Sequence, residues 1–381
     1  MGNARSTFCP SSTKRAGPSE WFRSTTLETG GFDPVDGPAS VYAPARGPGS
    51  WNFDWLLPEA ATRVYSLGRW AFVDALRLAG ASGRRVLLPE FICREVLAAL
   101  AEVEAKPVYY PVSPGLGLAA DPGALPEAKA VVAVDYFGFP QNLAPFEEYC
   151  RRTGAVLIED NAHGALSRDG SGVPLGGRAP LGVFSPRKTV SIPDGGALAV
   201  NAANRFPPLP GPLPFTGRTP GLASFGKRRA LRTIATGLGP RWTLRVIGLL
   251  RALRRLKDGR ELPAPDPDGE RRIPIPPEPG PAQRHGFPQD PDSEVRRRRS
   301  LYAFCAERLV GTAARPVFKE LPEGTSPYGF PFRAAPEDLA SIEAALAAEG
   351  LFSLPWPDLP NEVSPRAPAH YRNIRLVHFQ W

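Results

Sequence analysis

A carboxylate, a histidine and a lysine near the middle of the chain have the residue types best suited to carry chemistry. Asp160 and His163 lie in the stretch VLIEDNAHGAL, where a run of apolar residues ends in polar ones. Lys188 lies in VFSPRKTVSIPDGGALAVN, just before a Gly-Gly pair that indicates a tight turn. A buried carboxylate is costly unless it meets a positive partner, so we expect Asp160 and Lys188 to face one pocket.

These residue types suit pyridoxal 5'-phosphate (PLP). PLP needs a lysine amine for its aldehyde, a carboxylate for its ring nitrogen and backbone N–H groups, best at a helix N-terminus, for its phosphate. Gly68 leads into a predicted helix whose first amides belong to Arg69 and Trp70. Taken singly, each residue also has a structural interpretation: Asp160 as a helix cap, Lys188 as a surface lysine, His163 as a partly buried histidine.

The elements around these residues alternate along the chain. Short apolar runs predict strands, and helical spacing of apolar residues after Gly68 predicts a helix. Strands are expected at 84–91, 106–112, 128–138 and 155–160, and helices at about 68–79, 93–105 and 143–153.

This alternation indicates an α/β fold. Strands that are apolar on both faces and separated by helices predict a mainly parallel central sheet with helices on both faces. In such sheets, chemistry gathers at the carboxyl ends of the strands. Asp160 lies at such an end, which explains why a buried strand would finish in polar residues.

The region from about Tyr65 to Asn201 resembles the DegT/DnrJ/EryC1/StrS family of PLP-dependent sugar aminotransferases, which have fold type I. Four segments carry the resemblance: SLGRWAFVDAL, VLLPEFIC, VDYFGFPQNLAPFEEYCRRTGAVLIEDNAHG and VFSPRKTVSIPDGGALAVN. Two later segments, RRRRSLYAFCAERL and SPYGFPFRA, resemble the small domain of the family more loosely.

The resemblance implies a role for each matching residue. Lys188 would bind the cofactor aldehyde and move the substrate proton, Asp160 would contact the ring nitrogen, and His163 would contact the ring face or its 3'-oxygen. Phosphate contacts are implied for Gly68, Arg69, Trp70 and Ser185. Cys93 occupies the place where many members have an aromatic residue over the ring.

The implied function is transfer of an amino group to a keto-sugar, expected to be nucleotide-linked, from an amino-acid donor. This would serve polysaccharide or secondary-metabolite sugar biosynthesis, in a homodimer. One alternative is other PLP chemistry on sugars, such as dehydration, against which the presence of Lys188 argues. Another is a non-catalytic, membrane-surface-associated relative with a decayed site, because the N-Y-R segment of the family is not visible.

Composition divides the 381 residues into four parts, because 46 prolines and 38 glycines concentrate outside the middle. We expect an irregular arm at 1–50 and a large PLP-binding α/β domain at 51–205. Pro-rich connectors that flank a basic amphipathic helix are expected at 206–285. A small α+β domain, possibly truncated, is expected at 286–381.

The net charge of +8 favours anionic partners in general but identifies none. The four cysteines have no metal-type spacing, and no apolar run is long enough to span a bilayer, so we expect no metal and a cytoplasmic location. Residues 227–257 combine leucines at near-helical spacing with many arginines. That segment is expected to pack on its own protein or a dimer mate, or to make weak membrane-surface contact. Nucleic-acid binding is not expected, since no aromatic stacking platform accompanies it.

Overall fold

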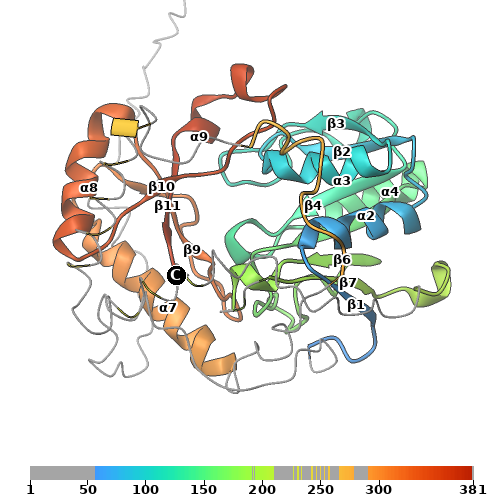
Figure 1. The fold of residues 1–381 in the computed structure, drawn as a ribbon, viewed down its shortest axis with the longest axis horizontal. Helices are drawn as coiled ribbons and strands as arrows, with labels where there is room; N and C mark the ends of the chain where they lie inside the picture. The colour runs from blue at the N-terminus through green and yellow to red at the C-terminus, as the bar shows by residue number, and fades with distance from the viewer. Residues whose placement is uncertain are drawn as a thin grey trace, which may run out of the picture.

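The computed structural model describes residues 56–190, 192, 194–209, 266–278 and 291–379, with single helical positions between 226 and 257. The described residues form two units, a larger one built on a wide sheet and a smaller one at its side (Figure 1). The predicted arm at 1–50 and most of the basic segment at 227–257 lie outside the described residues. The four domain boundaries stay predictions.

The larger unit is built on a seven-stranded sheet with the order β1-β7-β6-β5-β4-β2-β3. Its strands are β1 (Ala61–Tyr65), β2 (Arg85–Pro89), β3 (Lys106–Tyr110), β4 (Ala130–Val134), β5 (Val156–Asn161), β6 (Leu181–Phe184) and β7 (Gly196–Val200). All neighbouring pairs are parallel except those that include β7, which is antiparallel to both β1 and β6. The prediction of a mainly parallel sheet is confirmed.

Helices connect these strands where the apolar spacing predicts them. They are α2 (Gly68–Leu78), α3 (Leu97–Glu102) and α4 (Ala144–Thr153), and α2 packs on β6 and β7 as well as on α3. The path from β1 through β2 to β3 crosses the sheet in one direction, and the path from β4 to β5 crosses it in the other. Right-handed connections therefore place α2 and α3 on one face and α4 on the other.

The sheet brings distant segments together at one edge. Strand β4 ends before Asp135 and β5 ends at Asn161, while Ser185 follows β6. Strand β7 starts at this edge, because its Gly196 pairs with Tyr65 at the end of β1. The start of α2, the end of β5 and the turn that holds Lys188 therefore lie close together.

The smaller unit contains a four-stranded antiparallel sheet in the order β10-β11-β9-β8. Its elements are α7 (Pro291–Arg308), β8 (Arg315–Pro316), β9 (Gly329–Arg333), α8 (Leu339–Ala348), β10 (Leu354–Pro355), α9 (Ala369–Arg372) and β11 (Ile374–His378). Buried aromatic side chains of Tyr302, Phe330 and Phe332 belong to the same apolar cluster as the strands of the larger unit. The two units therefore share one continuous core.

Candidate active site

Lys188 lies at the end of a short turn, Pro186–Lys188, directly after β6. Its backbone N–H donates to the carbonyl of Ser185 at 2.9 Å, which closes the turn. The Nζ atom lies 3.2 Å from Nε2 of His163. Burial lowers the pKa of the Lys188 amine, and the neighbouring Arg187 lowers it further. The geometry thus favours a neutral, nucleophilic amine.

His163 is held from three sides. Its Nδ1 accepts a hydrogen bond from the backbone N–H of Phe137 at 3.3 Å. The ring of Tyr328 stacks on its own ring at 4.6 Å between centroids and 10° between planes. Burial, and then the charge of Lys188, hold the pKa of His163 well below its usual range, so the ring is neutral. With Nδ1 as acceptor, the single ring proton resides on Nε2, which faces Lys188.

Asp160 ends β5 with a buried side chain, 6% exposed. Its Oδ1 accepts a hydrogen bond from the backbone N–H of Ala162 at 3.1 Å. Burial raises the pKa of its carboxyl group, whereas the charge of Lys188 lowers it. A buried carboxylate in this position is stabilised by a cation, such as a protonated ring nitrogen.

The start of α2 lies against the residue that follows β6. A Cβ atom on Gly68 would come within 2.9 Å of the Phe184 carbonyl oxygen and 3.2 Å of Ser185 Cβ, so only glycine permits this approach. No side chain caps the helix at Leu67. The first amides of α2 and the Ser185 hydroxyl thus converge as donors for an anion.

Two arginines add positive charge near the start of α2. Arg69 pairs with Glu95 at 3.7 Å and is mostly covered, so its side chain does not point freely into solvent. The charge of Arg69 also acts on the buried Arg187, whose pKa burial lowers. Arg187, which precedes Lys188, is a residue that the sequence did not single out.

Trp70 contacts a segment whose Pro-rich composition predicts a connector. Its backbone N–H donates to the carbonyl of Leu67 at 3.1 Å, and its indole N–H donates to the carbonyl of Ile275 at 2.5 Å. Of the three α2 residues expected at the phosphate, Gly68 and Arg69 thus offer the first amides, while the Trp70 side chain faces residues 266–278.

We call residues 266–278 the strap. At one end, Glu270 pairs with Arg94 at 3.4 Å and accepts a hydrogen bond from the backbone N–H of Asn361 at 2.7 Å. At the other, the carbonyls of Pro276 and Pro277 accept hydrogen bonds from the side chain and backbone of Ser66. The strap lies beside the larger unit in Figure 1 and reaches the start of α2. Its Pro-rich composition alone does not reveal these contacts.

Cys93 lies near Lys188, and burial raises the pKa of its thiol. The nearby Phe91 contacts the rings of Tyr136 and Tyr371, at 5.5 and 5.4 Å between centroids. The Cys93 thiol thus lies within electrostatic reach of Lys188, whereas the aromatic ring of Tyr328 stacks on His163.

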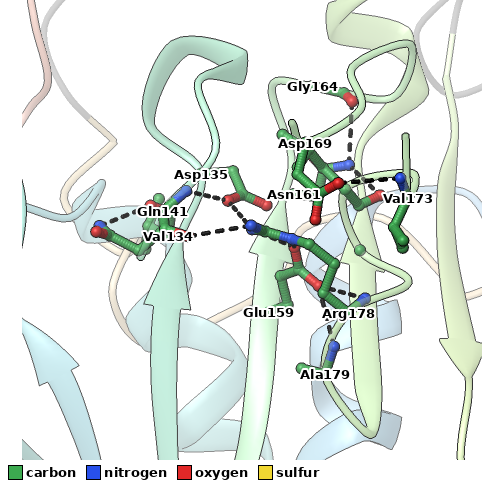
Figure 2. A network of polar contacts seen from close by, with 12 residues as sticks. Val134, Asp135, Gln141, Glu159, Asn161, Gly164, Asp169, Val173, Arg178 and Ala179 are labelled. Atoms are coloured by element: carbon green, nitrogen blue, oxygen red, sulfur yellow. Dashed lines mark hydrogen bonds and ion pairs between the residues drawn. The ribbon is translucent and has the colours of Figure 1, made fainter. Parts of the chain in front are cut away.

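A buried polar network supports the ends of β4 and β5 beside the site (Figure 2). Arg178 donates from Nε to Glu159 and from Nη2 to Asp135, both at 2.7 Å. Glu159 precedes Asp160 on β5, so its side chain points to the opposite face of the sheet. Burial raises the pKa of Asp135, and the nearby Glu159 raises it further, whereas Arg178 lowers it. The network fixes β5 without contributing to the Lys188 pocket.

The residues at this edge fit PLP in their donor and acceptor chemistry. Lys188 supplies an amine, Asp160 a buried carboxylate, and Gly68 with Ser185 a set of anion donors. Within the described ranges, no group of three or more His, Cys, Asp or Glu side chains could hold a metal ion. Likewise, no helix in those ranges is both long and apolar enough to cross a membrane.

Comparisons with known proteins agree with this chemistry. The model of the DegT/DnrJ/EryC1/StrS aminotransferase family matches residues 66–205. A comparison with curated proteins gave no match.

Among solved structures, the chain is similar to a DegT DnrJ EryC1 StrS aminotransferase from Brucella abortus, with 18% identity, a TM-score of 0.56 and coverage of 90% of this chain and 89% of that one. It is also similar to the PLP form of the putative sugar aminotransferase Spr1654 from Streptococcus pneumoniae, with 13% identity, a TM-score of 0.56 and 92% coverage of both chains. PseC from Helicobacter pylori, an aminotransferase involved in pseudoaminic acid biosynthesis, gives 14% identity, a TM-score of 0.55 and 92% coverage of both chains.

At these identities the structural likeness establishes the fold. The matched range contains Gly68, Asp160, His163 and Lys188. The sequence resemblance is confirmed over that range: residues 66–205 match the model of the DegT/DnrJ/EryC1/StrS aminotransferase family, and the chain has the type I fold of the solved structures it resembles.

Proposed function

We propose that this protein transfers an amino group from an amino-acid donor to a nucleotide-linked keto-sugar, with PLP held by Lys188. The observation that carries the proposal is the position of the Lys188 amine. It lies 3.2 Å from His163 Nε2 and within the electrostatic reach of the buried Asp160. When bound, PLP supplies an electron sink that stabilises negative charge at the substrate carbon.

Each residue of the site has a distinct task in this proposal. Asp160 holds the ring nitrogen in its protonated form through its negative charge. The first amides of α2 and the Ser185 hydroxyl hold the phosphate. His163 carries its ring proton on Nε2, 3.2 Å from Lys188 Nζ, and so orients the lysine amine. Cys93, within electrostatic reach of Lys188, would contact the cofactor next to that lysine.

The lowered pKa of Lys188 suits proton transfer at the substrate carbon. A neutral Nζ would take the proton from the donor's α-carbon and deliver it to the cofactor carbon C4′ within the same half-reaction. It would move a proton in the opposite direction when the keto-sugar receives the amino group. A base works best when its pKa lies near the working pH, and burial lowers the pKa of Lys188 in that direction from its ordinary value of 10.5.

Replacement of Lys188 tests the proposal. Lys188→Ala should abolish activity and the covalent attachment of PLP, because no other lysine follows a strand end of this sheet in the same way. The measurement is borohydride reduction of the PLP-loaded protein, followed by mass spectrometry of the peptide that contains residue 188. Lys106, exposed at the start of β3, is the matched control. Attachment of PLP at another lysine in the variant would sink the assignment.

The sugar substrate rests on similarity. PseC and Spr1654 are described as an aminotransferase in pseudoaminic acid biosynthesis and a putative sugar aminotransferase. We expect the PLP-loaded protein to convert to its amino form with glutamate or glutamine and to return to the aldehyde form with a nucleotide-linked keto-sugar. If the amino form returns to the aldehyde form only with α-keto acids, the protein is still an aminotransferase, but a keto-sugar is excluded as its substrate.

A cytoplasmic homodimer is proposed for the whole protein. Leu249, Leu253 and Leu256 have helical conformation and are 61%, 54% and 86% exposed. Their spacing of four and three residues puts them on one helix face, which a partner subunit would cover. Contact with an acidic membrane surface is the alternative use of this face.

A further inference from the structure

The largest fully buried side chain of the described residues is a charged one, which belongs to the smaller unit but reaches the lysine turn. Arg298, on α7, is fully buried at 0% exposure. A buried guanidinium is costly unless each of its nitrogens has a partner. The contacts of Arg298 therefore show what this side chain is for.

All three guanidinium nitrogens of Arg298 donate hydrogen bonds. Nε donates to the carboxylate of Glu294 at 2.7 Å, which balances the charge. Nη2 donates to the carbonyl of Thr189, the residue after Lys188, at 2.6 Å. Nη1 donates to the carbonyl of Pro327 at 3.2 Å and more weakly to that of Tyr328 at 3.5 Å. The planar fork thus joins two backbone segments that are far apart in the sequence.

Both of these segments lead to the amine of Lys188. Thr189 is adjacent to Lys188, and its hydroxyl donates to the carbonyl of His163 at 3.3 Å. Tyr328 stacks on the ring of His163 at 4.6 Å. The backbone N–H of Tyr328 donates to the carbonyl of Phe137 at 2.8 Å. Since His163 Nε2 is 3.2 Å from Lys188 Nζ, the contacts close a ring around the lysine.

We propose that Arg298 is a positioning residue for Lys188: it clamps the lysine turn to the segment that carries Tyr328 and so fixes the amine beside His163. Arg298 itself touches neither the amine nor the pocket. The inference depends on the proposed function only in that Lys188 is the reactive amine.

Arg297 provides a matched control on the same helix. It is also buried, and its Nε and Nη2 atoms donate to Glu294 at 2.8 and 2.6 Å. Its further bond goes to the carbonyl of Phe379 at 3.2 Å, away from the lysine turn. Substitution of either arginine disturbs the same carboxylate, but only substitution of Arg298 frees the turn.

The test measures the reactivity of Lys188 in the protein without PLP. Trace acetic anhydride labels neutral amines, and mass spectrometry gives the labelling of Lys188 relative to the exposed Lys106 as a function of pH. The titratable and charged groups that face Lys188 in this measurement are Cys93, Glu95, Asp160, His163 and Arg187. None of them is changed in the variants.

Arg298→Gln should raise the pKa of Lys188 toward its ordinary value, because a loosened turn exposes the amine to water. A rise of one unit lowers the neutral fraction of the amine about tenfold below that pKa, so capture of added PLP at neutral pH should slow by ~10-fold. Arg297→Gln should lose comparable thermal stability yet leave the labelling curve of Lys188 in place. Equal curves for the two variants, or no change in Arg298→Gln, would overturn the proposal.

Arg298→Lys keeps the test decisive if Arg298→Gln does not fold. Its ammonium retains the charge beside Glu294, but one nitrogen cannot bridge the Thr189 and Pro327 carbonyls as the fork does. An unchanged Lys188 titration in Arg298→Lys would also contradict the clamp. Because labelling needs no cofactor, its result is independent of whether Lys188→Ala abolishes PLP attachment, and the two proposals fail separately.

Discussion

Three side chains at the edge of the main sheet, Lys188, His163 and Asp160, owe their chemistry to burial. Burial lowers the pKa of the first two and raises that of the third. Each shift disfavours the charged form of the group. A charged ligand that binds next to these side chains would therefore change which of them are ionised.

Replacement of the Asp160 carboxylate should slow catalysis but leave PLP attached. Asp160→Asn keeps an oxygen for the Ala162 N–H but removes the negative charge that holds the ring nitrogen protonated. We expect the amino-transfer half-reaction to slow by ~10²–10³, equivalent to ~3–4 kcal/mol. Single-turnover absorbance kinetics with the amino-acid donor measure this loss.

Asp135→Asn is the control for that variant. Asp135 follows the neighbouring strand β4 and is also fully buried, but it pairs with Arg178 instead of facing Lys188. Its half-reaction rate should stay close to that of the unmodified protein. Equal losses in the two variants would show that buried charge in general, and not the position of Asp160, controls the rate.

His163 should make the stability of the protein depend on pH in a defined window. Its pKa is lowered in the folded state, so below the ordinary histidine pKa of 6.5 the unfolded chain binds a proton that the folded chain does not. Stability is therefore lost as the pH falls below that value. In His163→Gln this contribution disappears, and the free energy of unfolding should fall less steeply, by up to ~1.4 kcal/mol per pH unit.

Urea unfolding of both proteins between pH 7.5 and pH 5 measures this difference. We expect the change in the free energy of unfolding over that range to differ between the two proteins by ~2 kcal/mol. The other histidines are present in both proteins, so their contributions to the pH dependence of stability cancel in the comparison. Parallel stability curves would mean that His163 is protonated in the folded state, which would contradict its role as a donor through Nε2 alone.

At the scale of elements, the ends of β4 and β5 depend on the arginine between their carboxyl groups (Figure 2). Arg178→Met would leave Asp135 and Glu159 buried side by side without a cation. We expect a loss of ~3–5 kcal/mol in the free energy of unfolding. The loss should grow as the pH rises, because both carboxyl groups must then ionise without a partner.

Chemical denaturation at pH 5 and pH 8 checks this result. Asp135→Asn is again the matched variant: it keeps Arg178 paired with Glu159 and removes a carboxyl group whose pKa is already raised. It should cost much less than Arg178→Met at either pH. A larger loss in Asp135→Asn would show that the charge of Asp135 stabilises the network despite its burial.

Local signals in the sequence predict four of the seven strands of the main sheet, β2 to β5, whereas β1, β6 and β7 are not predicted. An apolar run such as AVLIED indicates a buried strand, and the polar residues after it indicate an edge. The residue types place Asp160 and Lys188 at one pocket, and the family resemblance adds His163. The structure places Lys188 Nζ 3.2 Å from His163 Nε2.

The contacts that hold these residues are not predictable in that way. Arg298 lies in a run of four arginines that reads as a solvated helix face, and only packing shows that it is buried. Tyr328 is 165 residues from His163, the difference between their numbers, and no periodic pattern links them. The strap has the composition of a connector, and its carbonyl contacts to Ser66 and Trp70 leave no trace in residue types.

At the scale of the whole molecule, the exposed leucines of the basic helix predict a dimer. Size-exclusion chromatography with light scattering should give twice the chain mass of 41.1 kDa. Leu253→Glu with Leu256→Glu should yield monomers, because two charges cannot be buried in an apolar interface. A single-chain mass for the unmodified protein, with PLP bound, would exclude the dimer.

The alternative use of the same face has its own readout. If the face binds membranes, the protein should sediment with acidic vesicles at low salt and be released as the salt concentration rises. The absence of sedimentation at low salt would leave only a packing role. Dimers that also sediment would place the leucines at the membrane and the subunit contact elsewhere.

The bond from Arg298 to the Thr189 carbonyl spans 109 positions of the chain, and this separation has a consequence for biosynthesis. Chains grow from the N-terminus, and the larger unit through β7 leaves the ribosome well before α7 is made. During that interval the lysine turn exists without its clamp, and Tyr328 is not yet available to His163. We therefore expect the amine to become fully organised only after residue 328 has been added, and the cofactor to be captured after that point and not during synthesis of the larger unit.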